Sequence, residues 1–277
     1  MEQPAESIGA AATERNAGAT PSALRAPARV PFDAPWMWLA AGWRDLWQTP
    51  QIGLVYGAAF ALGACGLALA LYAVGAHALF PALGGGFLLL APFLAMGLYE
   101  TSRRLAAGEP VSLGRAMGAG FAARGQLSFF GVVLMVVFLV WLELAFILLV
   151  LFMGGRGLPP PSEFVATLLF TLPGLGLLIV GSIVGGLLAA LVFAISAVAV
   201  PMLLVEQTDA VTAMRASVRA VAANPKPMAL WAALIAVMIG AGFVTLLAGL
   251  IVAFPLVGHA TWHAYRTIYG HEPGHSA

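Results

Sequence analysis

Glu143 is the residue whose type and position could most readily carry chemistry in this chain. It lies near the middle of an apolar segment, in the run FLVWLELAF. An ionised carboxylate costs about 2.5 kcal/mol or more at the centre of a bilayer, so we expect Glu143 to face the interior of a helix bundle, to be protonated, or both. It then either couples to a proton or cation, or forms a structural hydrogen bond to a neighbouring helix. No second charge within the apolar segments is evident to pair with it, which favours the structural interpretation.

Two histidines, His259 and His263, lie one helical turn apart in the last apolar segment. Imidazoles at positions i and i+4 project from one face of a helix and can hold one metal ion. A third ligand is not evident, although Glu206 and Glu100 are of a suitable type. Histidines near the end of a span also serve as interface anchors. That interpretation is favoured here, so we expect no metal and no cofactor.

A charged group follows the second apolar segment and consists of Glu100, Arg103 and Arg104, while Arg219 lies in a later amphipathic stretch. Charges at the end of a span set the topology and form salt bridges. We expect this group to pair with Asp and Arg residues of helices on the membrane surface. The sequence contains no phosphate-binding loop, nucleophile triad or Cys/His zinc pattern, so we do not expect an enzyme.

The composition places these residues in a membrane protein. Of 277 residues, 61% are hydrophobic and 9% are charged, whereas soluble domains carry about 25% charged residues. A chain of this length cannot bury so much apolar surface in water, so lipid must cover the remainder. The net charge of +1 and the lack of a clustered basic patch exclude a nucleic-acid-binding protein.

The predicted fold class is all-α, a polytopic membrane helical bundle. One crossing needs about 20 mostly apolar residues, and six segments provide them. The predicted spans are residues 51–75, 79–99, 126–153, 174–204, 228–246 and 249–269. The single membrane domain is placed at 33–269, between an N-terminal tail at 1–32 that we expect to be disordered and a short C-terminal tail at 270–277.

The apolar stretch at 164–206 allows two interpretations, because Pro173 interrupts it. It holds either two spans, or a short outer-surface helix at 162–172 followed by one span. With one span, every Lys and Arg except Arg156 falls on the same side, as expected of the cytoplasmic side. We therefore predict six spans with both termini in the cytoplasm. Arg greatly outnumbers Lys, as in GC-rich bacteria, which points to a bacterial inner membrane.

Three amphipathic stretches, each just before a span, predict helices that lie along the cytoplasmic surface at 33–49, 112–124 and 208–223. In the first, apolar side chains such as Trp43 and Leu46 share one helical face, which we expect to meet lipid, while the charged side chains lie elsewhere. Helices with this pattern lie in the plane of the interface.

These stretches indicate an internal repeat of three units, each an interfacial helix followed by a helical hairpin. The first unit matches the third at one constant offset, and the second span matches the sixth at another; the middle unit matches least well. Repeats of this kind are common in membrane folds and can frame a pathway. The matched pairs include Arg44 with Arg219, Pro50 with Pro225, Pro92 with Pro255, and Arg103 with Arg266.

Several motifs resemble an uncharacterised family of bacterial integral membrane proteins, domain-of-unknown-function family 2189. The motifs are GWRDL at 42–46, GLYETSRRLAAGEPVSL at 97–113, the segment at 201–235, and PLVGHATWHAYR at 255–266. The resemblance covers about residues 36–268. It implies a membrane setting, but no established activity and no site residues. Members are sometimes labelled as resembling cytochrome c oxidase subunit I.

The oxidase label conflicts with the histidines of this chain. Haem and copper centres of such an enzyme need several His ligands deep within spans. Only His259 and His263 share a helical face here, and they lie near the predicted inner surface. We therefore expect no oxidase activity from this chain alone, and an accessory role beside a respiratory complex stays open.

Two functions compete on these observations. The first is a non-enzymatic membrane scaffold or accessory protein that acts through membrane lipid or other membrane proteins. The second is a small-solute or ion permeation protein that uses Glu143. A pathway needs a polar track through the bundle, and the spans offer few polar residues besides Glu143. The first function is therefore favoured.

Overall fold

The computed structural model describes residues 25–76, 79–119, 124–154, 159–206 and 208–270. Within these ranges the regular structure consists of helices, with no strand. Five helical segments are long and apolar enough to cross a membrane: Pro50–Ala73, Leu83–Ala107, Arg124–Met153, Leu172–Val205 and Pro225–Val244. The all-α membrane fold is therefore confirmed, and four of the predicted spans agree closely with these segments.

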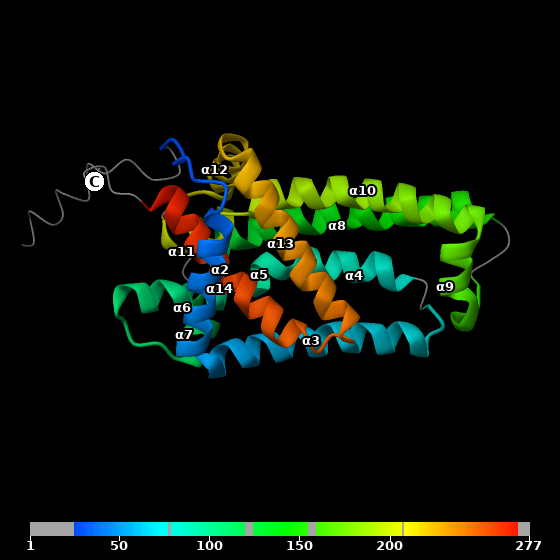
Figure 1. Ribbon diagram of the computed structural model, residues 1–277, viewed down its shortest axis with the longest axis horizontal. Coiled ribbons are helices and arrows are strands. Elements are labelled where there is room, and N and C mark those ends of the chain that lie inside the picture. Colours follow the sequence, from blue (N-terminus) through cyan, green and yellow to red (C-terminus); the bar gives the residue numbers. More distant parts are fainter. Residues whose placement is uncertain (1–24, 77–78, 120–123, 155–158, 207, 271–277) are drawn as a thin grey trace, which may run out of the picture.

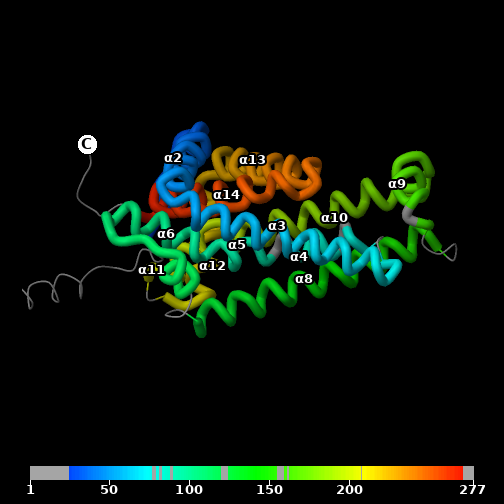
Figure 2. The backbone as a smooth tube through the Cα atoms, turned by 90° about the horizontal axis from the view of Figure 1, so that it is seen from below, coloured from blue at the N-terminus to red at the C-terminus, as the bar shows by residue number. Residues whose placement is uncertain are grey.

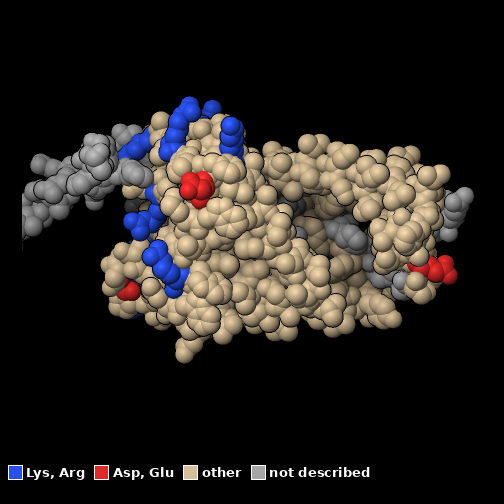
Figure 3. Space-filling view, in the orientation of Figure 1, with Lys and Arg blue, Asp and Glu red and all other residues tan. Residues whose placement is uncertain are grey.

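Three long helices run along the long axis of the molecule, and shorter helices lie across both ends. Helices α3 (Pro50–Ala73), α8 (Arg124–Met153) and α10 (Leu172–Ser196) follow the long axis. Helix α2 (Ala34–Gln48) crosses it near one end and α9 (Pro161–Phe170) near the other (Figure 1). These are the places where the sequence predicts helices along the two surfaces. We call the end that carries α2 the basic end, because Lys and Arg gather there (Figure 3).

The first and third units turn the same corner between their surface helix and the next span. The C-cap of α2 is Thr49, with φ −132° and ψ 53°, and the C-cap of α12 (Ala210–Ala223) is Asn224, with φ −129° and ψ 53°. The next helix begins with proline in both cases, Pro50 in α3 and Pro225 in α13 (Pro225–Val244). Proline fits the first helical turn because its missing N–H is not needed there. The two corners that the sequence matched through Pro50 and Pro225 therefore have the same backbone geometry.

In the middle unit, the place where such a corner would lie falls partly outside the described residues. The sequence predicts a helix at 112–124, but α7 covers only Leu113–Met117, with Gly118 as its C-cap. Residues 120–123 lie outside the described part of the chain, and α8 begins directly after them. A three-unit repeat therefore stays a prediction.

The second and sixth predicted spans differ from continuous crossing helices. The second is divided into α4 (Phe80–Leu89), α5 (Ala91–Leu94) and α6 (Met96–Ala107). Proline near the start of α5 removes a backbone donor at the first break. The sixth is α14 (Leu250–Tyr269), which is not among the five apolar segments. Its second half carries His, Arg and Tyr, which lower its hydropathy.

The structure describes the N-terminal segment from Arg25 onward, and residues 1–24 of the tail predicted at 1–32 lie outside the described residues. The backbone N–H of Ala28 donates to the carbonyl of Ile268 at 2.9 Å. The Asn224 amide binds the same N-terminal segment: it accepts from Val30 N–H at 2.9 Å and donates to the Ala28 carbonyl at 3.0 Å. The beginning of the described chain is therefore fastened to α14 and to the corner after α12.

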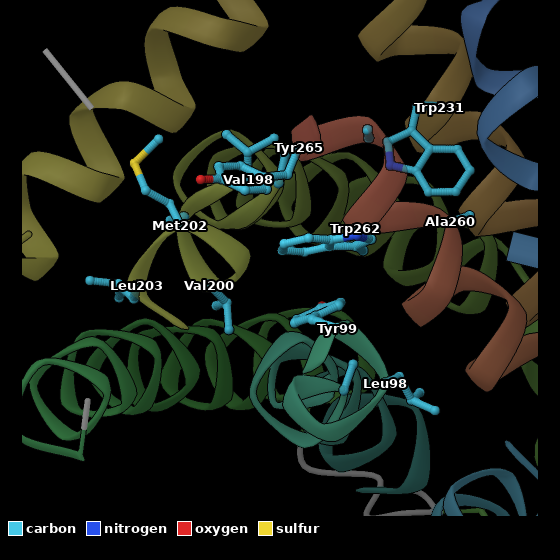
Figure 4. Packing of buried hydrophobic residues seen from close by; sticks show 14 of the residues in the cluster. Leu98, Tyr99, Val198, Val200, Met202, Leu203, Trp231, Ala260, Trp262 and Tyr265 are labelled. Carbon is cyan, nitrogen blue, oxygen red and sulfur yellow. The ribbon is translucent and has the colours of Figure 1, made fainter. Parts of the chain in front are cut away.

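The core lies at the basic end, where α2, α6, α11 (Ala199–Val205), α12 and α14 meet (Figure 4). Trp38 and Trp231 pack edge to face with ring centroids 5.8 Å apart. Trp262 of α14 and Tyr99 of α6 point toward one another in the same core (Figure 4). By contrast, only 11% of the most apolar 18-residue stretch of α8 is buried. Helix α8 forms an outer edge of the bundle (Figure 2). The chain thus packs tightly at one end and presents α8 to its surroundings.

Helix α2 uses small residues to reach this core and turns several tryptophans outward. Gly42 lies so close to α14 that an added Cβ would be 2.6 Å from the Ala260 nitrogen. Leu46 is buried, so the expectation that it shares a lipid-facing surface with Trp43 is wrong. The outward face instead carries Trp36, Trp43 and Trp47, each more than 40% exposed.

Candidate functional site

A buried polar cluster joins three helices at the basic end. Asp45 of α2 accepts two hydrogen bonds on Oδ2, from Ser102 Oγ of α6 at 2.6 Å and from His263 Nε2 of α14 at 2.8 Å. His259 Nδ1, one turn before His263, lies 2.8 Å from Ser102 Oγ. Ser102 and His259 are fully buried and Asp45 is 8% exposed. We call these four residues the Asp45 cluster.

The hydrogen-bond roles in the Asp45 cluster follow from the single proton of a hydroxyl. Ser102 gives that proton to Asp45, so Oγ must accept from a protonated His259 Nδ1. His259 Nε2 then carries a lone pair, and this buried atom has no hydrogen-bond partner among the described residues. Burial alone would raise the pKa of Asp45, but hydrogen bonds from His263 and Ser102 hold that pKa below its usual value.

This arrangement suits a structural role, in which hydrogen bonds join three helices, better than activation of Ser102 as a nucleophile. In a catalytic triad the serine gives its proton to histidine, and a carboxylate orients that histidine. Here Ser102 donates to Asp45 directly, so His259 is not placed to remove its proton. A carboxylate that accepts charge-assisted hydrogen bonds from two other helices fixes α2, α6 and α14 to one another.

The histidines predicted as weak metal ligands bind separate partners in the Asp45 cluster. Of the two glutamates considered as a third ligand, Glu206 accepts from the Tyr265 hydroxyl at 2.6 Å and Glu100 binds arginines. No group of three His, Cys, Asp or Glu residues within the described ranges could hold a metal ion. Sequence reasoning missed Asp45 and Ser102, although both lie in motifs that resemble the family, GWRDL and TSRRL.

Charged residues at the end of α6 form a second network. Glu100 binds Arg103 Nε at 2.7 Å and Arg104 Nε at 2.6 Å. Glu109, just past the helix, binds the same two arginines at 3.1 and 3.2 Å. The hydrogen bond from Arg103 lowers the pKa of Glu109. The sequence predicted pairing with the surface helices, but in the structure the four ion pairs above lie within α6 and the turn that follows.

A pocket of about 440 Å³ opens beside this network. Arg103, Arg104 and Arg115 line it together with Glu100, and Leu204 and Val205 of α11 are among its apolar lining residues. Arg115 donates from Nη1 to the Pro110 carbonyl at 2.8 Å. We call this space the arginine pocket. A smaller pocket of about 300 Å³ lies next to the Asp45 cluster, lined by His263, Arg266, Thr267 and Gly270.

The remaining predicted site residues lie apart from these groups. Arg219 is exposed on α12 at the basic end. Glu143 is exposed on α8 and does not face the bundle interior, so the first of the two expected arrangements is not the one found. The inner face of α8 is occupied by aromatic side chains, since Phe138 packs on Gly86 and Trp141 packs on Gly185. These contacts fix the rotation of α8 and turn Glu143 outward.

Comparison with known proteins agrees with this architecture and adds no activity. No curated protein and no solved structure matches the chain. Residues 79–205, which run from the start of α4 to the end of α11, match the family DUF2189, described as a predicted integral membrane protein.

Proposed function

We propose that this protein is a non-enzymatic scaffold of the bacterial cytoplasmic membrane, with its basic end and both termini in the cytoplasm. Its arginine pocket would hold the phosphate of an anionic lipid headgroup. The observation that carries this proposal is the gathering of Arg103, Arg104 and Arg115 around one pocket at the basic end of α6. Membrane proteins carry their Lys and Arg excess on the cytoplasmic side.

The chemistry of the arginine pocket suits a lipid phosphate. A guanidinium group presents a planar fork of donors that matches phosphate oxygens. Glu100 and Glu109 hold Arg103 and Arg104 in place, and the three arginines leave one net positive charge over these two carboxylates. The apolar wall from α11 suits the glycerol and acyl part of a lipid.

Helix α2 supports the same function. Trp36, Trp43 and Trp47 are exposed along it, and Arg44 is exposed beside them. Tryptophan prefers the headgroup level of a membrane, where its ring meets both apolar and polar surroundings. A helix that lies across the spans with such a face is suited to rest in the interface.

The alternative function, permeation that uses Glu143, has less support. The carboxyl lies on the outside of the bundle, away from any route between the spans of one chain. Both pockets described above lie at the basic end and not along the spans.

The test compares lipid binding by single-arginine variants. The protein is purified in detergent, and bound phosphatidylglycerol and phosphatidylcholine are counted by native mass spectrometry. Arg115→Gln should weaken phosphatidylglycerol binding roughly tenfold, because it removes one charge-assisted contact to phosphate. The matched control is Arg215→Gln, an exposed arginine of α12 that does not line the pocket.

Three results would contradict the proposal. They are equal loss in both variants, equal binding of the two lipids by the wild type, and full competition by millimolar inorganic phosphate. The last result would show a site for free phosphate instead of a headgroup. Solute flux through reconstituted vesicles that Glu143→Gln abolishes would instead support permeation.

A further inference from the structure

The outward face of α8 carries a single acidic residue in an otherwise apolar row. Exposed side chains recur along this helix at alternating spacings of three and four residues. The row consists of Phe129, Val132, Val136, Leu139, Glu143, Phe146 and Val150. This is the spacing of a seam through which two helices pack, and Glu143 lies within it.

Glu143 lies deep in the membrane. About 15 Å of helix separates it from Met153 at the end of α8, at ~1.5 Å per residue, which is half of a hydrocarbon core of ~30 Å. No hydrogen bond or ion pair joins the Glu143 carboxyl to another described residue. A charged or unpaired polar group is unfavourable in hydrocarbon, and such residues face a partner or a cavity in membrane proteins. The bundle of one chain does not cover this group, so we look for its partner outside the chain.

A second copy of the chain offers the matching group at the matching depth. Two copies inserted in the same direction are related by a rotation about the membrane normal, which keeps every residue at its own depth. A twofold contact through α8 therefore brings Glu143 of one copy to Glu143 of the other. Two carboxyl groups at close range do not both ionise and can share a proton. Each then supplies the hydrogen-bond partner that the single chain lacks.

We propose that α8 is a homodimerisation helix, with the two Glu143 carboxyls hydrogen-bonded to one another across a twofold axis. Leu139 and Phe146, about one turn on either side, are exposed and pack against their counterparts. Phe138 and Trp141 hold the opposite face of α8 inside the bundle and keep this seam turned outward. A polar residue at one seam position also fixes register, because sliding the helices would separate the pair. The arginine pocket plays no part in this dimer.

The first experiment measures association of the full-length chain in lipid nanodiscs or vesicles by single-molecule photobleaching at several protein-to-lipid ratios. Glu143→Leu should raise the dimer dissociation constant roughly tenfold, because an interhelical hydrogen bond in a membrane is lost. Glu143→Gln should stay close to the wild type, since an amide pair also donates and accepts. Glu163→Leu on α9 is the matched control, because this exposed glutamate lies outside the seam.

The second experiment maps the contact by disulfide cross-linking in membranes. Cys65 is exposed on α3 and must first be replaced by Ala. In that background Leu139→Cys should cross-link to a second copy, whereas Leu62→Cys, on the exposed face of α3, should not. A wild type that stays monomeric at high density would overturn the proposal, as would a Glu143→Leu variant that dimerises equally well. Cross-linking of Leu139→Cys only to a different protein would show that another partner covers Glu143.

Discussion

Asp45 holds α2, α6 and α14 together through one oxygen atom. It accepts hydrogen bonds from Ser102 and His263, which come from two other helices. Removing the charge leaves buried donors with a weaker acceptor, and such a loss costs about 1–3 kcal/mol. We expect Asp45→Asn to lower the melting temperature of the purified protein, measured by circular dichroism in detergent. Asp209→Asn is the control, because Asp209 only caps the exposed start of α12.

The same residue predicts how stability depends on pH. The folded-state pKa of Asp45 is lowered, so its stabilisation is fully present above the unfolded pKa of about 3.9 and is lost as pH falls through the folded pKa. The stability advantage of the wild type over Asp45→Asn should therefore shrink in acid. The melting temperatures of the two proteins should converge below about pH 4. A difference between them that stays constant from pH 7 to pH 3 would contradict this assignment.

Close contact of helix α2 with α14 depends on Gly42. An added Cβ would lie 2.6 Å from the backbone nitrogen of Ala260 and 3.0 Å from its Cβ. Gly42→Ala should therefore destabilise the protein by about 1–3 kcal/mol, since one helix must shift. Gly66→Ala on α3 meets no atom within 4 Å and should be neutral or slightly stabilising, because alanine favours helix. Equal melting temperatures for the two variants would refute the close packing of α2.

Sequence reasoning identified most helices but misjudged, for some of them, which face is buried. Apolar runs mark α3, α8 and α13 because a membrane requires that length of apolar helix. The direction of Glu143 depends on where Phe138 and Trp141 find glycines on other helices, which hydropathy does not encode.

The Asp45 cluster was missed for a related reason. Its members lie far apart in the chain: Asp45 and Ser102 are 57 positions apart, and Asp45 and His263 are 218 positions apart. Each looks like an ordinary polar residue at the end of a span until the fold brings them together. The pair His259 and His263 was found from its spacing, but spacing alone does not show that each imidazole has another partner.

Both ends of the described chain lie at the basic end. Five segments qualify as spans, and an odd number of complete crossings would put the two ends on opposite sides of the membrane. The hydrogen bond between Ala28 and Ile268 places the start of the chain beside the end of α14. Helices α13 and α14 form a hairpin that returns the chain to this end, and its turn lies short of the far end that carries α9 (Figure 1). The hairpin therefore extends less far along the long axis than α3, α8 and α10.

The turn of this hairpin has an apolar surface and internal hydrogen bonds. Val244 is 84% exposed and Leu246 is 90% exposed, so the tip presents apolar side chains to its surroundings. Leu247 N–H donates to the Gly242 carbonyl at 2.9 Å, and Thr245 Oγ1 accepts from Gly249 N–H at 2.9 Å. Backbone groups in lipid need such internal partners.

We therefore expect the α13–α14 tip to end within the bilayer. In the Cys65→Ala background, Leu246→Cys should resist a membrane-impermeant maleimide added to either side of sealed vesicles. Ser162→Cys, on the exposed start of α9, should react from one side only. Rapid labelling of Leu246→Cys from the side that labels Ser162→Cys would show that the hairpin crosses completely, as the six-span topology requires. Protection of Leu246→Cys would reduce the complete crossings to four, with the hairpin entering and leaving at the basic end.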